Sequence, residues 1–175
     1  MVAIFNGFGG GASALVATAE FFSKYGTSEQ STFLVTTIIL SIFIGTLTLT
    51  GSFIAFGKLQ GFISGQPIVF KGQQALNAII MMGLIVFAVY TVLGGANQMN
   101  AFYVVIVLSA LIGITLTIPI GGADMPVVIS LLNSYSGIAA SATGFVLMNN
   151  GLIIAGALVG ASGLILTNIM CKGMN

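Results

Sequence analysis

Histidine, arginine and tryptophan do not occur in this sequence of 175 residues, and cysteine occurs once, at Cys171. Without histidine the chain has no imidazole for a metal site, a catalytic triad or a proton relay. One cysteine can form neither an internal disulfide bond nor a cysteine zinc cluster. Without arginine, and with only four lysines, the chain has no basic patch that would neutralise nucleic-acid phosphates.

Charge of either sign is scarce. Three acidic residues and four lysines make up 4% of the chain, whereas a soluble domain is usually about 25% charged. Hydrophobic residues account for 57% of the sequence. This composition excludes a soluble globular domain and a disordered tail, and it indicates a polytopic membrane protein.

Six apolar stretches are each long enough to cross a bilayer as a helix, which takes about 20 residues. Their hydrophobic runs are continuous and do not alternate with a period of two, so helices rather than barrel strands are expected. We therefore predict an all-α fold, a polytopic transmembrane helix bundle in a single domain. The predicted helices cover residues 2–22, 32–56, 78–95, 101–120, 126–148 and 151–171.

The charged residues all fall at the ends of these stretches or between them, as the cost of placing a charge in hydrocarbon requires. Lys58, Lys71 and Lys172 belong to the side that carries both termini, and Lys24 belongs to the other side. Because lysine is enriched in cytoplasmic loops, both termini are predicted to lie on the cytoplasmic or matrix side.

Small and polar residues form stripes along several of the predicted helices. Gly156, Gly160 and Gly163 are spaced by four and three residues and so share one face of the last helix. Lipid is as apolar as leucine, so membrane helices associate through small residues that let their backbones approach. We interpret this glycine face as a packing contact. The hydroxyl-bearing stripes, which include Ser52 and Ser130, fit either close packing or a hydrated path for a small species.

Two asparagines lie inside predicted helices. An amide in an apolar environment costs about 2–7 kcal/mol unless it is hydrogen-bonded, so Asn6 and Asn133 each need a partner helix or water. Either residue fits an interhelical hydrogen bond or a polar path through the membrane, and both interpretations stay open.

Asp124 lies in the connection before the fifth predicted helix. Gly121 and Gly122 allow a sharp turn there, and Pro126 suits the first turn of the helix that follows. Asp124 can therefore cap that helix at its positive end. Asn133 follows nine residues later, about 13 Å deeper along the same helix. A surface carboxylate followed by a mid-membrane polar group suits proton uptake. The same spacing would also arise if Asp124 only capped the helix and Asn133 only packed against a neighbouring helix.

Four segments together resemble the membrane domain of the β subunit of proton-translocating NAD(P) transhydrogenases. The longest is GGADMPVVISLLNSYSG at 121–137, and the others are GALVGASG at 156–163, IMCKGMN at 169–175, and TGS with AFGKL at 50–59. The resemblance extends over nearly the whole chain, and the segment around Asp124 and Asn133 is specific to this family.

The resemblance implies a role in coupling proton movement to hydride transfer. In this family soluble domains bind NAD(H) and NADP(H), and the membrane domain conducts the proton, so this chain is expected to bind no cofactor, carry no catalytic residue and lack hydride-transfer activity alone. Asp124 corresponds to an aspartate that faces the NADP(H) domain, and Gly156, Gly160 and Gly163 to a glycine-lined helix. The candidate proton path comprises Asn133, Asn6, Ser52 and Ser130.

The sequence departs from the family pattern in two respects. Asn6 stands where some members carry a histidine, and an amide cannot take up a proton near neutral pH. Protons would then cross on water held by the asparagines and hydroxyls, with Asp124, or second to it Glu20, as the titrating group. We also expect a fragment or split subunit that lacks upstream helices and a downstream NADP(H)-binding domain.

The expected partners are the lipid bilayer and the other transhydrogenase subunits, in a dimeric complex within a bacterial plasma membrane or a mitochondrial inner membrane. Nucleic acid is not an expected partner. Two other functions use the same residues: a small-solute channel or transporter, and a structural membrane subunit. Solute uptake by liposomes that hold the chain alone would favour the channel, and tolerance of substitutions at Asn133 and Asp124 would favour the structural subunit.

Overall fold

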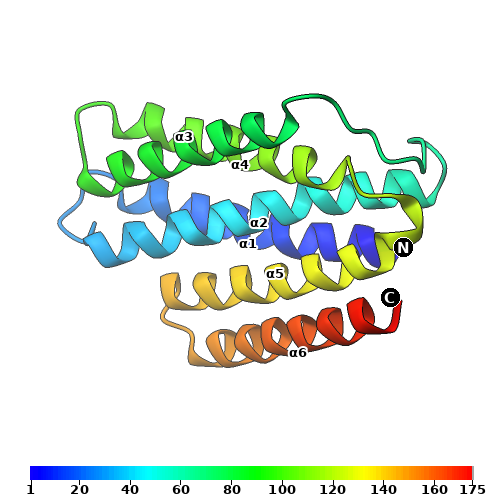
Figure 1. Cartoon of the computed structure of the whole chain (residues 1–175). Helices are drawn as coiled ribbons and strands as arrows, with labels where there is room; N and C mark the ends of the chain where they lie inside the picture. Colours follow the sequence, from blue (N-terminus) through cyan, green and yellow to red (C-terminus); the bar gives the residue numbers. More distant parts are fainter. Residues whose placement is uncertain (175) are drawn as a thin grey trace.

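The computed structural model describes residues 1–174 and is built from six long helices and one short 3₁₀ turn (Figure 1). This confirms the predicted all-α helix bundle; Asn175, the last residue of the matched ending, lies outside the described part. The elements are α1 (Val2–Lys24), α2 (Thr32–Leu59), α3 (Gln73–Leu93), α4 (Gln98–Thr117), η1 (Gly122–Asp124), α5 (Met125–Val146) and α6 (Asn150–Met174).

The helix ends differ most from the predicted ones at α3 and α4. Helix α3 begins at Gln73 rather than at residue 78. Its first turn is largely polar, so the apolar run from which the helix was predicted begins later. Helix α4 ends at Thr117 rather than at residue 120, because Pro119 has no N–H to donate to the carbonyl of Thr115. The side-chain Nε2 of Gln73 donates to that carbonyl instead, at 3.1 Å.

The helices run up and down, and α2 lies at the centre. Helix α2 contacts α1, α3, α4 and α5, while α6 packs against α5 and α3 packs mainly against α4. Both chain ends lie at one end of the bundle, together with the connections 60–72 and 118–124 (Figure 1). The other end carries the connections between α1 and α2, α3 and α4, and α5 and α6.

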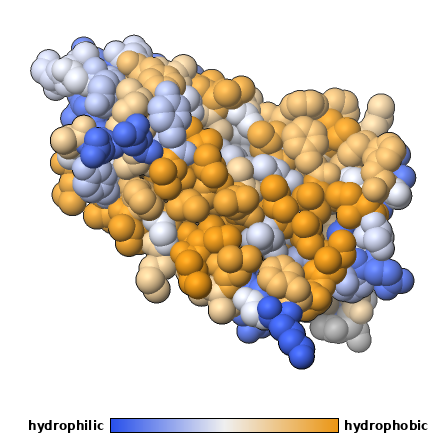
Figure 2. Space-filling view, turned by 90° about the horizontal axis from the view of Figure 1, so that it is seen from above, coloured by the Kyte–Doolittle hydropathy of each residue, from blue (hydrophilic) through white to orange (hydrophobic). Residues whose placement is uncertain are grey.

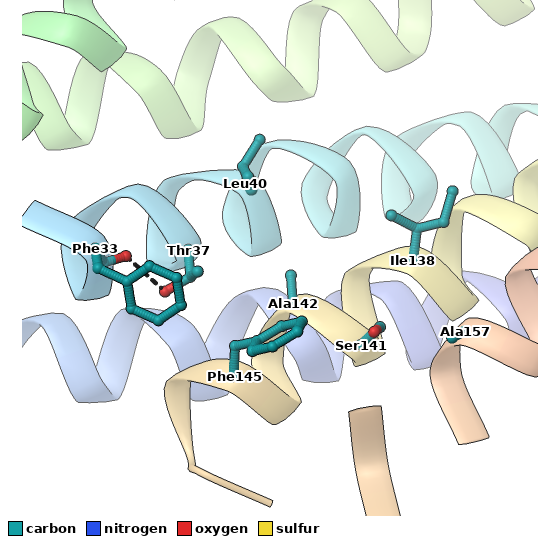
Figure 3. Close-up of a pocket in the computed structure, with 8 residues that line it drawn as sticks. All are labelled: Phe33, Thr37, Leu40, Ile138, Ser141, Ala142, Phe145 and Ala157. Carbon is teal, nitrogen blue, oxygen red and sulfur yellow. Dashed lines mark hydrogen bonds between the residues drawn. The ribbon is translucent and has the colours of Figure 1, made fainter. Parts of the chain in front are cut away.

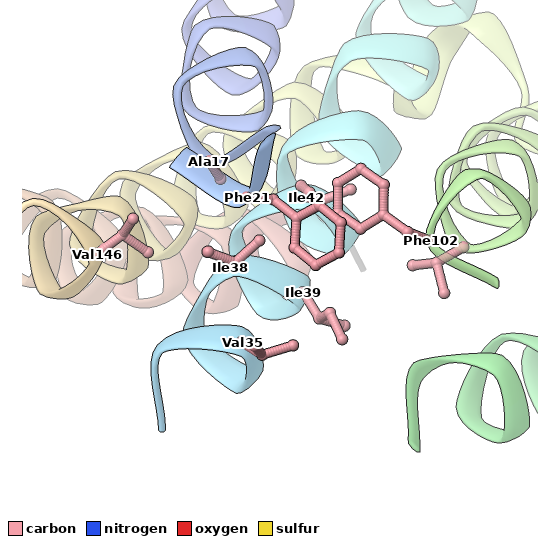
Figure 4. Packing of buried hydrophobic residues seen from close by; sticks show 9 residues of the cluster. Ala17, Phe21, Val35, Ile38, Ile39, Ile42, Phe102 and Val146 are labelled. Atoms are coloured by element: carbon pink, nitrogen blue, oxygen red, sulfur yellow. The ribbon is translucent and has the colours of Figure 1, made fainter. Parts of the chain in front are cut away.

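The largest apolar cluster (Figure 4) is formed near the ends of α1 and α5 and the starts of α2 and α4, toward the end of the bundle opposite the termini. Phe21 of α1 stacks on Phe102 of α4, with ring centroids 3.8 Å apart, and both side chains are fully buried. Ile38 and Ile42 of α2 and Val146 of α5 pack into the same cluster. Four helices are therefore joined by apolar packing at this end.

Glycine sets the distance between neighbouring helices. A Cβ built on Gly45 of α2 would lie 2.5 Å from the carbonyl oxygen of Gly10 on α1. A Cβ on Gly137 of α5 would lie 2.5 Å from the amide nitrogen of Gly160 on α6. At both contacts the backbones touch, as is typical of helix pairs in a membrane.

The outer surface is suited to lipid. All six helices are long and apolar enough to span a membrane. Figure 2 shows hydrophobic side chains over the middle of the bundle and hydrophilic ones gathered toward its two ends. The chain is therefore an integral, multi-pass membrane protein.

Two adjacent glycines of α1 give a matched test of the α1–α2 contact. A Cβ on Gly10 would lie 2.8 Å from the Gly45 carbonyl oxygen, whereas a Cβ on Gly9 would have no neighbour within 4 Å. We expect Gly10→Ala to destabilise the bundle by about 1–3 kcal/mol through overpacking. Gly9→Ala should be neutral or stabilise by up to about 1 kcal/mol, because alanine favours the helix. Thermal unfolding of both variants in one detergent measures the difference, and equal stabilities would contradict the backbone contact.

Candidate functional site

A hydrogen-bonded polar cluster lies where α1, α2 and α5 meet. The carboxamide of Asn6 donates through Nδ2 to Ser52 Oγ at 3.0 Å and accepts through Oδ1 from Ser136 Oγ at 2.6 Å. Asn6 and Ser52 are buried, and Ser136 is half-buried. These three residues, the Asn6 cluster, connect three helices through one amide.

The Ser136 hydroxyl has a choice of acceptor. Its oxygen lies 2.6 Å from Asn6 Oδ1 and 2.9 Å from the backbone carbonyl oxygen of Asn133, one turn earlier in α5. A hydroxyl has a single proton to donate. The proton of Ser136 can therefore point either to the Asn6 cluster or back along its own helix.

A second polar cluster lies deeper between the same three helices. Ser41 of α2 and Thr143 of α5 are buried with their hydroxyl oxygens 2.6 Å apart. Both oxygens also approach the carbonyl oxygens of Ser13, at 3.3 and 3.4 Å, and Ala139, at 3.3 and 3.0 Å. We call these four residues the Ser41 cluster.

The spacing of the two clusters follows from the helix repeat. Ser13 follows Asn6 by seven residues, and Thr143 follows Ser136 by seven residues. Seven residues are two turns, so corresponding groups share a helix face and lie about 10 Å apart along the axis. The Gly10–Gly45 contact lies between the clusters, and the apolar cluster around Phe21 lies beyond the Ser41 cluster.

Ser130 lies at a different contact. Its side chain faces α6, where Thr167 Oγ1 donates to Ser130 Oγ at 3.1 Å and Ser130 Oγ lies 3.4 Å from the Gly163 carbonyl oxygen. Ser134 Oγ donates to the carbonyl of Gly160 on the same face. Ser130 is thus not brought together with Asn6 and Ser52, although sequence reasoning grouped the three.

The glycines of α6 form that face. A Cβ on Gly156 would lie 2.6 Å from the carbonyl oxygen of Gly137, and a Cβ on Gly163 would lie 2.9 Å from Ser134 Cβ. Gly160 touches the same side of α5. The three glycines face α5, and they allow the serines of α5 to reach carbonyl groups of α6.

Asn133 is exposed on the outside of the bundle. Within residues 1–174 no hydrogen bond involves its carboxamide, and only its backbone carbonyl is tied to the Asn6 cluster, through Ser136. It precedes Ser136 and Gly137 by one turn, and both of these line a groove of about 220 Å³ between α1 and α6. The structure therefore places Asn133 beside the Asn6 cluster but on the open side of α5.

Asp124 ends the 3₁₀ turn and precedes α5. It occupies the N-cap position, but its side chain makes no capping hydrogen bond, and it is exposed. The turn is held instead by its backbone, where the amide of Gly122 donates to the carbonyl of Gly65 at 2.8 Å. The carboxylate is therefore available to water or to a partner at the positive end of α5.

A larger crevice, of about 350 Å³, opens between α2, α5 and α6 (Figure 3). Its walls are apolar apart from Thr37 and Ser141, whose hydroxyls donate to the carbonyls of Phe33 and Ile153. No ionisable side chain lines it. Its shape and lining suit a hydrocarbon chain and not a proton relay.

Sequence reasoning missed the role of Ser136 and the pairing of Ser41 with Thr143. The missed signal is the spacing of Ser136 and Thr143, which are seven residues apart on one face of α5 and bond to Asn6 and Ser41. A helix that repeats hydroxyl side chains at this interval can hydrogen-bond to its neighbours at two levels.

Comparison with known proteins adds a family match over the full length. Residues 1–175 match the sequence profile of the family described as NAD(P) transhydrogenase beta subunit. Two relatives, both from Rhodospirillum rubrum and both named NAD(P) transhydrogenase subunit beta, are each 46% identical over 180 aligned residues. The match covers all of this chain and 38% of the length of each relative.

A double-mutant cycle tests the hydrogen bond between Asn6 and Ser136. We expect Asn6→Ala and Ser136→Ala to couple by about 0.6 kcal/mol and by no more than about 1.7 kcal/mol, the average and the maximum found for interhelical hydrogen bonds in membranes. Asn6→Ala combined with Ser162→Ala is the control, because Ser162 is exposed and its hydroxyl donates within α6, to the carbonyl of Val159. Unfolding of the solubilised bundle gives the energies. Additive effects of the Asn6 and Ser136 substitutions would argue against the contact.

Proposed function

This chain belongs to the NAD(P) transhydrogenase beta-subunit family, and we propose that its bundle is the proton-translocating membrane module of such an enzyme. In this role the bundle couples proton movement to hydride transfer between NAD(H) and NADP(H), which bind to other domains of the complex. The observation that carries the proposal is the Asn6 cluster, a buried polar contact that joins α1, α2 and α5.

The proposed path uses water and hydroxyl groups. Asparagine and serine do not take up protons near neutral pH, so the proton crosses on water that these side chains orient. Ser136 is the relay between the open groove and the interior, because its proton can point to Asn6 or to the Asn133 carbonyl. The Ser41 cluster is the next polar site in the proposed path, two turns further along α1 and α5.

Asn133 marks the face at which the bundle meets the rest of the complex. An exposed carboxamide nine residues into a membrane helix is costly in lipid unless another helix or water covers it. Another subunit or segment of a dimeric transhydrogenase complex would cover the groove beside α1 and α6. Asn133 and Ser136 would then line an enclosed, hydrated path.

Asp124 is the proposed contact for the NADP(H) domain. It is exposed at the start of α5, and α5 carries Asn133, Ser136 and Thr143 on its following turns. A change in the contacts of the carboxylate therefore acts on the helix that takes part in both polar clusters. Lysine distribution supports a position of this end of the bundle on the cytoplasmic side of a bacterial plasma membrane, or on the matrix side of a mitochondrial inner membrane.

Replacing Asn133 tests the proposed path. In vesicles that hold the full transhydrogenase complex, Asn133→Leu should abolish proton pumping, read from a pH-sensitive dye, and leave nucleotide binding intact. Asn100→Leu is the matched control, since Asn100 is an exposed asparagine at the start of α4. Normal pumping by the Asn133 variant would remove Asn133 from the path.

Replacing Asp124 tests the coupling. Allosteric coupling energies are typically about 1–3 kcal/mol, and a rise of that size in the barrier of the coupled step on Asp124→Asn would lower coupled turnover by about 5–150-fold. Glu29→Gln removes an exposed carboxylate at the opposite end of the bundle and should leave turnover unchanged. The measurement is the rate of hydride transfer driven by an imposed proton gradient. An unchanged rate in the Asp124 variant would point to a purely structural connection.

A further inference from the structure

Lys58 is a buried cation at the end of α2. Its side chain is 4% exposed, whereas Lys71 and Lys172, at the same end of the bundle, are exposed. Its ammonium group donates to three backbone carbonyls, those of Gln66, Ile118 and Ile120. Lysine has three N–H donors, so every donor has a partner.

The site that holds Lys58 is formed by the end of α4. The carbonyl of Ile120 lies 2.8 Å from Lys58 Nζ, and Ile118 is the C-cap of α4. A cation is stabilised at this negative end of a helix. Within residues 1–174 the ammonium has no carboxylate partner, since the ion pair found there joins Lys24 to Glu29 at the other end of the bundle.

The bonds of Lys58 join two connections. Gln66 belongs to the connection 60–72, and the other two acceptors belong to the connection 118–124, which carries Asp124. A further bond joins the same connections nearer to Asp124, where the amide of Gly122 donates to the carbonyl of Gly65. Lys58 therefore holds the polypeptide that leads into Asp124 against the end of α2.

Helix α2 links this site to the Asn6 cluster. Ser52 precedes Lys58 by six residues, or about 9 Å along the helix. Ser52 is the residue of α2 that accepts a hydrogen bond from Asn6. One rigid helix therefore carries a partner of the Asn6 cluster and the cation that fixes the Asp124 connection.

We propose that Lys58 is a positioning residue that fixes the Asp124 connection to α2, so that a change at Asp124 is transmitted to the Asn6 cluster through α2 as well as through α5. The inference rests on the proposed function for its consequence in coupling. The position of the connection itself does not depend on that function.

The primary test compares Lys58→Met with Lys71→Met in the full complex in membranes. Methionine keeps the length of the side chain and removes its three donors. We expect amide hydrogen exchange at Gly122 and Asp124 to be at least tenfold faster in the Lys58 variant than in the wild type. The number of protons moved per hydride transferred should fall severalfold, with nucleotide binding unchanged. Lys71→Met, which removes an exposed lysine, should match the wild type in both measurements.

The two measurements separate the possible failures. Wild-type exchange rates in Lys58→Met would overturn the positioning role. Faster exchange with an unchanged proton-to-hydride ratio would overturn the link to coupling. A wild-type complex that moved no protons would refute the proposed function, and the exchange rates alone would then decide whether Lys58 positions the connection.

A reversible cross-link tests whether Lys58 acts by holding the connections together. A Cβ on Gly122 would lie 3.5 Å from Gly65 Cα, whereas a Cβ on Gly65 would have no neighbour within 4 Å, so the two positions are close but not oriented for a direct disulfide bond. In a Cys171→Ser background with Gly65→Cys and Gly122→Cys, a short bis-methanethiosulfonate cross-linker should restore slow exchange and coupling to Lys58→Met, and reduction should reverse the rescue. Failure of the cross-linked pair would overturn the positioning role. If Lys58→Met does not accumulate in membranes, recovery of accumulation with the cross-link is the supporting result and continued loss is the overturning one.

Discussion

A polar group inside a bilayer must find its hydrogen-bond partner within the protein, and the interior of this bundle is organised by that requirement. Asn6 is hydrogen-bonded to hydroxyls from two other helices, and Ser41 is hydrogen-bonded to Thr143 and to backbone carbonyls. Lys58 is hydrogen-bonded to three carbonyls near the end of α4. Each solution joins segments far apart in the sequence. The polar groups therefore determine which helices are neighbours, while apolar packing around Phe21 fills the remaining space.

Helix α5 shows how small residues make these contacts possible. Ser134 reaches a carbonyl of α6 because glycine brings the two backbones together, Ser136 reaches Asn6 of α1, and Thr143 reaches Ser41 of α2. The side chains of Ser136 and Thr143 share the face of α5 that meets α1 and α2, while that of Ser134 points to α6. A displacement of α5 therefore changes hydrogen bonds to every helix that shares its polar contacts, and the exposed Asp124 lies directly before its first turn. Helix α5 therefore connects Asp124, at the end of the bundle, to the polar contacts in its interior.

The sequence predicts the helices of this fold better than it predicts their neighbours. Continuous apolar runs located all six helices, because length and hydropathy are local properties. The spacing of small residues on α6 indicated a packing face, but periodicity alone does not say which helix lies against it. Ser130 and Ser52 carry the same hydroxyl and lie on similar stripes, yet one faces α6 and the other faces Asn6. Lys58 looks like an ordinary interfacial lysine in the sequence, and only the fold brings three carbonyls to it.

Within residues 1–174 neither the Asn6 cluster nor the Ser41 cluster contains an ionisable side chain, and this constrains how the proposed proton movement can be controlled. Neither the Asn6 cluster nor the Ser41 cluster can store a proton, so conduction through them depends on water reaching both. The Gly10–Gly45 contact lies between the clusters with backbone touching backbone, and water cannot pass it without separation of α1 from α2. Control by helix separation needs a signal that reaches α2 from the surface. The buried ammonium of Lys58, bonded to the connection that carries Asp124, provides a physical route for such a signal without any change of charge inside the membrane.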